Sequence, residues 1–135
     1  MILLTSRTIW LFGDGPLARP DRFDRGNWPS VYINTIISKP DDPQLPADSI
    51  DAALLLKTYH EVAHPIVLLR NLGPSLKPGA KIGIIDRNGN GADHGVSKDV
   101  VVREAAQAGY ELRDSQDFVK ADGMDYFLIF TRKPD

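Results

Sequence analysis

Apolar residues follow two different spacings in the part of the chain after residue 30. The run Ile50–Leu56 is almost continuously apolar, which is typical of a strand buried on both faces of a sheet. Residues 31–37 and 81–86 also predict strands. Between them, leucines recur at helical spacing after Pro65, a residue suited to the first turn of a helix. The pattern predicts strands that alternate with helices. The leucines of this helix are Leu68, Leu69, Leu72 and Leu76.

Glycine, proline and capping residues set the expected ends of the helices. Gly73-Pro74 should kink the first helix, and Lys77-Pro78-Gly79 should end it. Ser97 is suited to the N-cap of a second helix, and Gly109 stands where a glycine commonly ends a helix. The apolar side of this second helix would carry Val100, Val101, Ala105 and Ala108.

Two further strands are expected near the C-terminus, over residues 111–119 and 125–132. Asp122-Gly123 is a strong turn signal between them, and strands joined by a tight turn are antiparallel. We therefore predict an α/β fold in which helices pack on a mostly parallel sheet with antiparallel strands at its C-terminal edge.

The first 30 residues predict an irregular N-terminal segment. Residues 8–12 favour a short strand, but Pro16, Pro20 and Pro29 leave no room for a helix of three turns. We expect the chain to divide into this segment, residues 1–30, and one α/β domain, residues 31–135.

Composition narrows the functional classes. The 135 residues carry a formal net charge of -2, which gives no case for nucleic-acid binding. The chain has no cysteine, so disulfides and thiolate metal sites are excluded. No apolar run approaches the ~18 residues of a membrane span, and the opening lacks a secretory signal, so we expect a cytoplasmic protein.

Several short motifs occur in an order that resembles one enzyme family. Residues 45–51 (Leu-Pro-Ala-Asp-Ser-Ile-Asp) precede the turn Tyr59-His60-Glu61, and Leu76-Lys77-Pro78-Gly79-Ala80 precedes a strand that ends in Asp86. This set, over about residues 31–133, resembles class I S-adenosylmethionine-dependent methyltransferases. The resemblance implies a partial Rossmann-like methyltransferase fold, S-adenosylmethionine as cofactor and a small-molecule methyl acceptor.

In an open α/β sheet, ligands lie beyond the carboxyl ends of the parallel strands. Residues 38–42, 57–61 and 86–90 would form that rim. The resemblance implies cofactor contacts from Asp41, Asp42, Lys57 and Thr58, catalytic roles for Tyr59, His60 and Glu61, and substrate contacts from Asp86, Arg87 and His94. Asp41 and Asp42 would replace an acidic residue of the family at Lys39, or they only cap a turn. His60 would line the methyl-transfer pocket and act as a base, or its ring would only pack locally.

The cofactor-binding loop of the family has no clear counterpart. Gly13-Asp14-Gly15 is the only candidate, but a βαβ unit needs about 30 residues or more. An acidic residue should follow about 20 positions later, where Ile33 stands, so a plain turn is expected instead. The sequence therefore predicts a truncated methyltransferase of doubtful competence, with a non-catalytic fold remnant or interaction module as the alternative. The loss would uncover one edge of the central sheet and the apolar face of Ile50–Leu56, so we expect a homodimer.

His60-Glu61-Val62-Ala63-His64 also matches the H-E-x-x-H zinc-hydrolase motif. That chemistry requires one helix through all five residues, so that both imidazoles face the metal. Pro65 disfavours helical geometry at His64, and the residues before His60 favour a strand. Zinc hydrolysis remains a minor alternative, and we expect no metal site. His94 lies in a glycine-rich loop, where a solvated side chain is the simpler reading.

Overall fold

The computed structural model describes residues 41–90, 95–117 and 125–134. It also describes the backbone of three shorter strands, β1 (Ile2–Leu4), β2 (Ile9–Gly13) and β3 (Tyr32–Ile36). The expectations for Pro16, Pro20, Pro29, His94 and the turn Asp122-Gly123 fall outside these residues.

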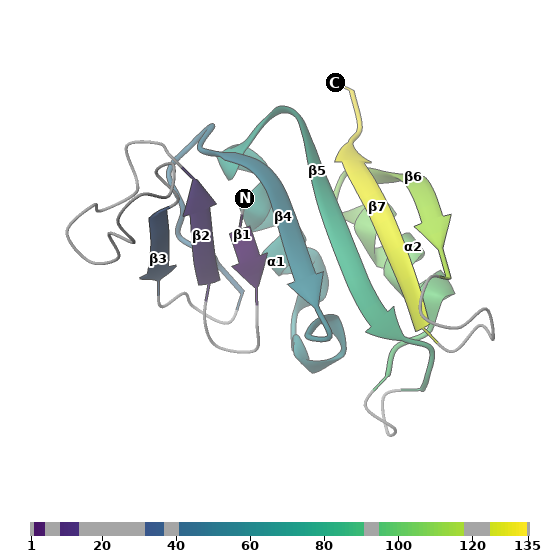
Figure 1. Cartoon of the computed structure of the whole chain (residues 1–135). Helices are drawn as coiled ribbons and strands as arrows, with labels where there is room; N and C mark the ends of the chain where they lie inside the picture. Colours follow the sequence, from purple (N-terminus) through teal and green to yellow (C-terminus); the bar gives the residue numbers. More distant parts are fainter. Residues whose placement is uncertain are drawn as a thin grey trace.

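The strands form one sheet in the order β3-β2-β1-β4-β5-β7-β6 (Figure 1). The longer strands are β4 (Ile50–Leu56), β5 (Leu76–Arg87), β6 (Tyr110–Gln116) and β7 (Asp125–Arg132). The predicted α/β class and antiparallel C-terminal edge are confirmed, since β7 pairs antiparallel with both β5 and β6. The sheet is mixed, because only β1 with β4 and β4 with β5 are parallel among the described pairs.

The N-terminal strands come from the stretch expected to be irregular. Only the four residues 5–8 separate β1 from β2, too few for the crossover that a parallel pair needs, so the two strands form an antiparallel pair. β1 then pairs parallel with β4, with Ile2 opposite Ala53. The expectation that an edge of β4 would be uncovered is therefore wrong, because the chain covers that edge with its own β1.

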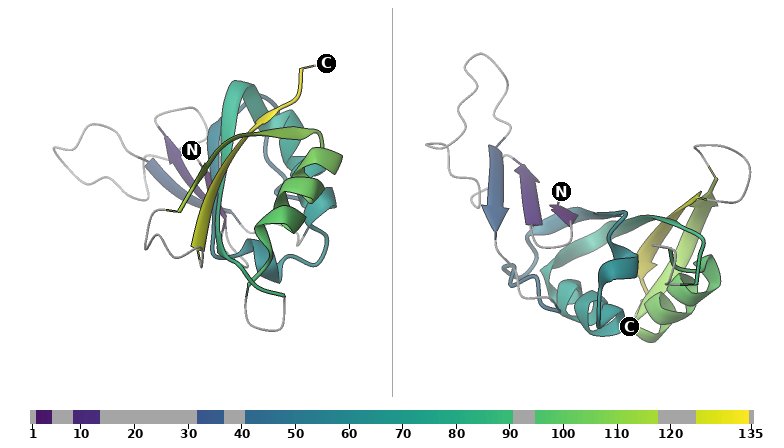
Figure 2. Two further views of the ribbon diagram at one scale, coloured as in Figure 1. Left: turned by 90° about the vertical axis from the view of Figure 1, so that its right-hand side faces the viewer. Right: turned by 90° about the horizontal axis from the view of Figure 1, so that it is seen from below.

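Two α-helices, α1 (Pro65–Leu72) and α2 (Lys98–Gln107), lie on the same face of the sheet (Figure 2). With eight and ten residues, neither reaches the length at which a helix of the described part could cross a membrane. α1 starts at Pro65 as expected but ends earlier, because Gly73–Ser75 forms a separate 3-10 turn, η2. Leu76 therefore begins β5 rather than ending the helix, and Lys77-Pro78-Gly79 lies inside β5, where Gly79 adopts a φ of 78°.

The hydrophobic core lies between this face of the sheet and the two helices. Along β7, Tyr126, Leu128 and Phe130 are buried, whereas the residues between them are half-buried, as the two-residue period of a strand requires. Burial of one such aliphatic or aromatic side chain contributes about 1.5–3 kcal/mol. On the helices, the buried residues of the same core are Leu68, Leu69, Leu72, Val101 and Ala105.

The opposite face of the sheet carries apolar residues that no described helix covers. Leu54 and Phe127 approach so closely over Gly83 that a Cβ there would lie 3.1 Å from Leu54 Cδ1 and 2.8 Å from Phe127 Cε2. Ile85 and Ile129 are half-buried, and Leu56 is 43% exposed. We call Leu54, Leu56, Ile85, Phe127 and Ile129 the open face of the sheet.

Candidate functional site

The carboxyl ends of the parallel strands β4 and β5 lie side by side and carry the predicted rim. Lys57 follows β4 with a φ of 48°, and its N–H donates to the carbonyl of Ile85 on β5 at 2.7 Å. The chain then forms a 3-10 turn, η1 (Tyr59–Glu61), where the backbone N–H of Glu61 donates to Thr58 O at 2.9 Å. This turn brings His60 over the end of β5.

Asp86 accepts the hydrogen bonds that hold this rim together. Its carboxylate is 0% exposed, yet it accepts two backbone N–H groups, from Arg87 at 2.8 Å and from His60 at 3.1 Å. The Nδ1 atom of His60 lies 2.9 Å and 3.0 Å from its two oxygens. Charge-assisted hydrogen bonds of this kind offset the cost of burying a carboxylate. Asp86 was expected at the substrate, but it lies beneath His60.

The contact with Asp86 sets the tautomer of His60. An ionised carboxylate only accepts hydrogen bonds, so the imidazole donates from Nδ1 to Asp86. The His60 side chain is 11% exposed, and Nε2 lies 3.8 Å from a carboxylate oxygen of Glu61. An imidazole oriented by a buried carboxylate is the arrangement that general-base catalysis uses.

Thr58 and Tyr59 are more enclosed than a ligand-binding residue would be. They are 3% and 2% exposed, and the Tyr59 hydroxyl donates to Glu104 Oε2 on α2 at 2.6 Å. Burial, together with this hydrogen bond to Glu104, raises the pKa of Tyr59 far above its ordinary value. The phenol therefore stays protonated and ties η1 to α2.

Sequence reasoning missed Tyr126, which lies opposite Asp86 on β7. Its hydroxyl donates to the carbonyl of Val96 at 2.7 Å. Burial and the charge of Asp86 both raise the pKa of Tyr126. Its alternating position on a buried strand was visible in the sequence, but its partner Val96, 30 positions away, was not.

The loop after β5 is fixed to the start of α2. The N–H of Val96 donates to the carbonyl of Arg87 at 2.8 Å, and Asn88 Oδ1 accepts the N–H of Lys98 at 3.0 Å. Ser97 occupies the expected N-cap position, but its side chain makes no capping hydrogen bond. The side-chain oxygen of Asn88 caps the helix in place of Ser97. His94, expected on the substrate side, lies outside the described residues.

The charged side chains at this rim face the solvent. Lys57 Nζ lies 3.7 Å from Asp125 Oδ1, with 56% of the lysine side chain exposed. Glu61 is 49% exposed, and Arg87 is exposed beside Asp86. A ligand above His60 would therefore meet Lys57, Glu61 and Arg87, whereas Thr58 and Tyr59 lie below.

Asp41 and Asp42 make local hydrogen bonds near the end of α1. The side-chain amide of Asn71, in the last turn of α1, donates to the Asp41 carbonyl at 2.8 Å. The rim residues precede the first turn of the same helix, and the eight residues of α1 span about 12 Å. Asp42 Oδ1 accepts the N–H of Gln44 at 2.9 Å, the turn-capping contact that was the alternative reading. Cofactor contacts from Asp41 and Asp42 stay a prediction.

The H-E-x-x-H residues do not form one helix. η1 ends at Glu61, Val62 is extended with a φ of -76° and a ψ of 121°, and His64 precedes α1 with a φ of -128° and a ψ of 69°. His60 bonds to Asp86 while His64 is exposed at the start of α1. Among the described residues, no group of three or more potential ligands gathers around a metal position. This backbone does not provide the geometry of zinc hydrolases.

The glycine motif of the N-terminal segment does not follow the family pattern either. Gly13 is the last residue of β2 and pairs with Tyr32 across an antiparallel ladder, so it lies in a strand rather than in a loop before a helix. Gly15 lies outside the described residues.

Comparison with solved structures identifies the fold. The chain is similar to a SAM-dependent methyltransferase from Aquifex aeolicus, with 21% identity and a TM-score of 0.61 over 72% of this chain and 53% of the other. It is also similar to a TehB-like SAM-dependent methyltransferase from Corynebacterium glutamicum, with 15% identity and a TM-score of 0.60 over 73% of this chain and 55% of the other. The 1,6-didemethyltoxoflavin-N1-methyltransferase of Burkholderia thailandensis, solved with S-adenosylhomocysteine, matches at 17% identity and a TM-score of 0.55, over 69% of this chain and 48% of the other.

These similarities show the fold of the chain. It is a partial class I methyltransferase fold, as predicted, and it spans about half the length of the matched structures. No protein family model matches the sequence. No curated protein matches it either.

Replacement of Asp86 by alanine tests whether this carboxylate holds the rim together. We expect Asp86→Ala to lower the free energy of unfolding by about 3–5 kcal/mol, because the N–H donors of His60 and Arg87 lose a buried acceptor. Asp125→Ala is the matched control. Its partner Lys57 is solvent-exposed, so the loss should be below about 1 kcal/mol. Chemical denaturation measures both, and equal losses in the two variants would contradict the assignment.

Proposed function

We propose that the chain provides the acceptor side of a methyltransferase site, with His60 as general base and Asp86 as its positioning residue. The observation that supports this most directly is the contact of His60 Nδ1 with the fully buried Asp86 carboxylate. It leaves Nε2 directed to the rim where ligands of open α/β sheets bind. The similar structures are SAM-dependent methyltransferases, so S-adenosylmethionine is the proposed methyl donor.

The proposed chemistry of this chain is proton removal from the acceptor. Nε2 of His60 would take the proton from a hydroxyl or amine that becomes methylated, and the carboxylate of Asp86 would stabilise the resulting imidazolium. Such positioned bases contribute about 10²–10⁴-fold in rate. The exposed charges of Lys57, Glu61 and Arg87 favour a polar small molecule as acceptor. A cytoplasmic location remains a prediction.

The methyl donor itself fits the described residues poorly. β1 and β2 pair antiparallel, unlike the crossover unit expected to carry an adenosine cradle, and the Asp41 carbonyl is hydrogen-bonded to Asn71 near the end of α1. Contacts to the adenosine would have to come from residues outside the described part or from a second chain. His60 and Asp86 therefore support proton transfer, whereas cofactor binding depends on other residues.

Calorimetric titration of the full chain with S-adenosylmethionine tests the cofactor part. We expect saturable heat with a dissociation constant below about 1 mM, equivalent to about -4.1 kcal/mol. His60→Ala should retain this binding, because His60 acts on the acceptor. Glu61→Gln, an exposed neighbour, is the control. The absence of heat at millimolar ligand would contradict the proposed cofactor.

A second candidate function is a non-catalytic interaction module that forms a homodimer. The specific observation in its favour is the open face, because both described helices pack on the other side of the sheet. An apolar sheet face is usually buried against another layer. A second copy of the chain would supply that layer through the same apolar residues, as a two-fold symmetric interface requires.

Light scattering on the purified chain tests this association. We expect twice the chain mass at high concentration, and we expect Leu56→Lys on the open face to give the monomer mass. Val67→Lys on α1 is the matched control, since Leu56 and Val67 are similarly exposed, at 43% and 41%. A monomeric wild-type chain, or an equal effect of both substitutions, would overturn the homodimer.

A further inference from the structure

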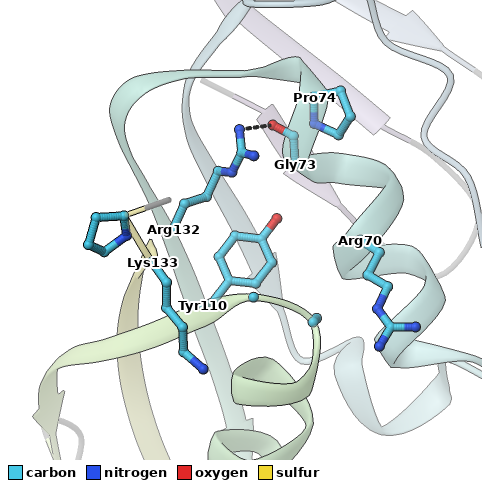
Figure 3. A pocket seen from close by; sticks show the side chains of 9 residues that line it. Arg70, Gly73, Pro74, Tyr110, Arg132 and Lys133 are labelled. Carbon is cyan, nitrogen blue, oxygen red and sulfur yellow. Dashed lines mark hydrogen bonds between the residues drawn. The ribbon is translucent and has the colours of Figure 1, made fainter.

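A cavity of about 330 Å³ lies at the end of the sheet opposite His60 and Asp86. It is lined by Gly73 and Arg70 at the end of α1, by Tyr110 at the start of β6, and by Arg132 and Lys133 at the end of β7 (Figure 3). β7 runs from Asp125, beside the rim, to Arg132, so more than about 20 Å separates the two places. The cavity is independent of the proposed catalytic residues.

Three cationic side chains from two separate parts of the chain line this cavity, with their charged ends at different sides of it (Figure 3). Each donates one hydrogen bond to a backbone carbonyl: Arg70 Nη2 to Gln107 at 3.1 Å, Lys133 Nζ to Ala106 at 3.0 Å, and Arg132 Nη1 to Gly73 at 3.1 Å. These carbonyls belong to the C-terminal ends of α2 and α1, where cations are favoured. Helix capping therefore explains in part why basic side chains gather at this cavity. Capping uses one N–H donor of each side chain, whereas an arginine side chain carries five such donors and a lysine side chain three.

The positive charge exceeds what the helix ends can balance. Each helix C-terminus carries about half a negative charge, so two of them offset about one of the three cations. No aspartate or glutamate lines the cavity among the described residues. Tyr110 adds no negative charge, because its hydroxyl donates to Leu69 O at 2.6 Å and burial raises its pKa to about 12. Among the described residues that line the cavity, a surplus of about two positive charges therefore remains.

We propose that this cavity binds the phosphate group of a small molecule. A phosphate dianion matches the surplus charge, and arginine and lysine side chains are the usual phosphate donors in proteins. A volume of about 330 Å³ falls within the range of small-molecule pockets and exceeds what one phosphate fills. Pro74 and Pro134 line the remaining space and would contact the organic part of a phosphate ester.

Titration of the full chain with inorganic phosphate and with phenyl phosphate, at constant ionic strength, tests this site. We expect backbone amide NMR signals of Gly73, Gly109 and Tyr110 to shift saturably in the wild-type chain. Tighter binding of phenyl phosphate would identify a phosphate ester as the ligand class, and equal binding would identify the phosphate group alone. Both results support a phosphate site. Shifts confined to other residues, or no saturation, would overturn it.

Arg132→Gln should weaken phosphate binding at least tenfold, because it removes a full charge while an amide donor remains for the Gly73 carbonyl. Arg113→Gln is the matched control. Arg113 lies on β6, pairs with Glu111, donates to Thr131 Oγ1 at 2.8 Å, and does not line the cavity. Equal weakening in both variants would show general charge attraction and overturn the proposal. The wild-type NMR result stands by itself if Arg132→Gln fails to fold.

Discussion

The hydrogen bonds of Asp86 join the ends of the two central parallel strands, and the rest of the rim depends on them. A carboxylate with no exposure to solvent is tolerated because three N–H groups from His60 and Arg87 surround it. The same contacts fix the position of η1 and the tautomer of His60. The hydrogen bonds that offset the burial of the Asp86 carboxylate therefore also orient the imidazole of His60.

The two described helices lie on the same side of the sheet around this rim. α1 and α2 cover the face that carries Leu128 and Phe130, whereas Phe127 and Ile129 point to the open face. The four residues between β1 and β2 are too few for a crossover helix, which is why these two strands pair antiparallel rather than parallel.

Much of the fold could be predicted from the sequence, because its determinants are local. The apolar run Ile50–Leu56 and Pro65 at the start of a helix are signals within a few residues. Leu76 was assigned to the wrong element, because its spacing fits the helix while Gly73-Pro74 ends it. The pairing of β1 with β4 was missed, since a three-residue strand is specified by its neighbours rather than by its own pattern.

The site could be predicted only in part. His60 and Asp86 were each selected, and the rule for parallel strand ends placed them together. The contact of Asp41 with the Asn71 side chain was not foreseen, because a contact between residues 30 positions apart produces no recognisable spacing in the sequence. The basic cavity was missed for the same reason, since Arg70 and Arg132 are far apart in the chain.

The orientation of His60 by Asp86 is the central claim, and ¹⁵N NMR of the imidazole nitrogens tests it most directly. The chain has three histidines, so His60→Gln assigns the signal. The account predicts that Nδ1 of His60 carries a proton, which it donates to Asp86. A ring whose only proton is on Nε2, or equal populations of the two tautomers, would contradict it.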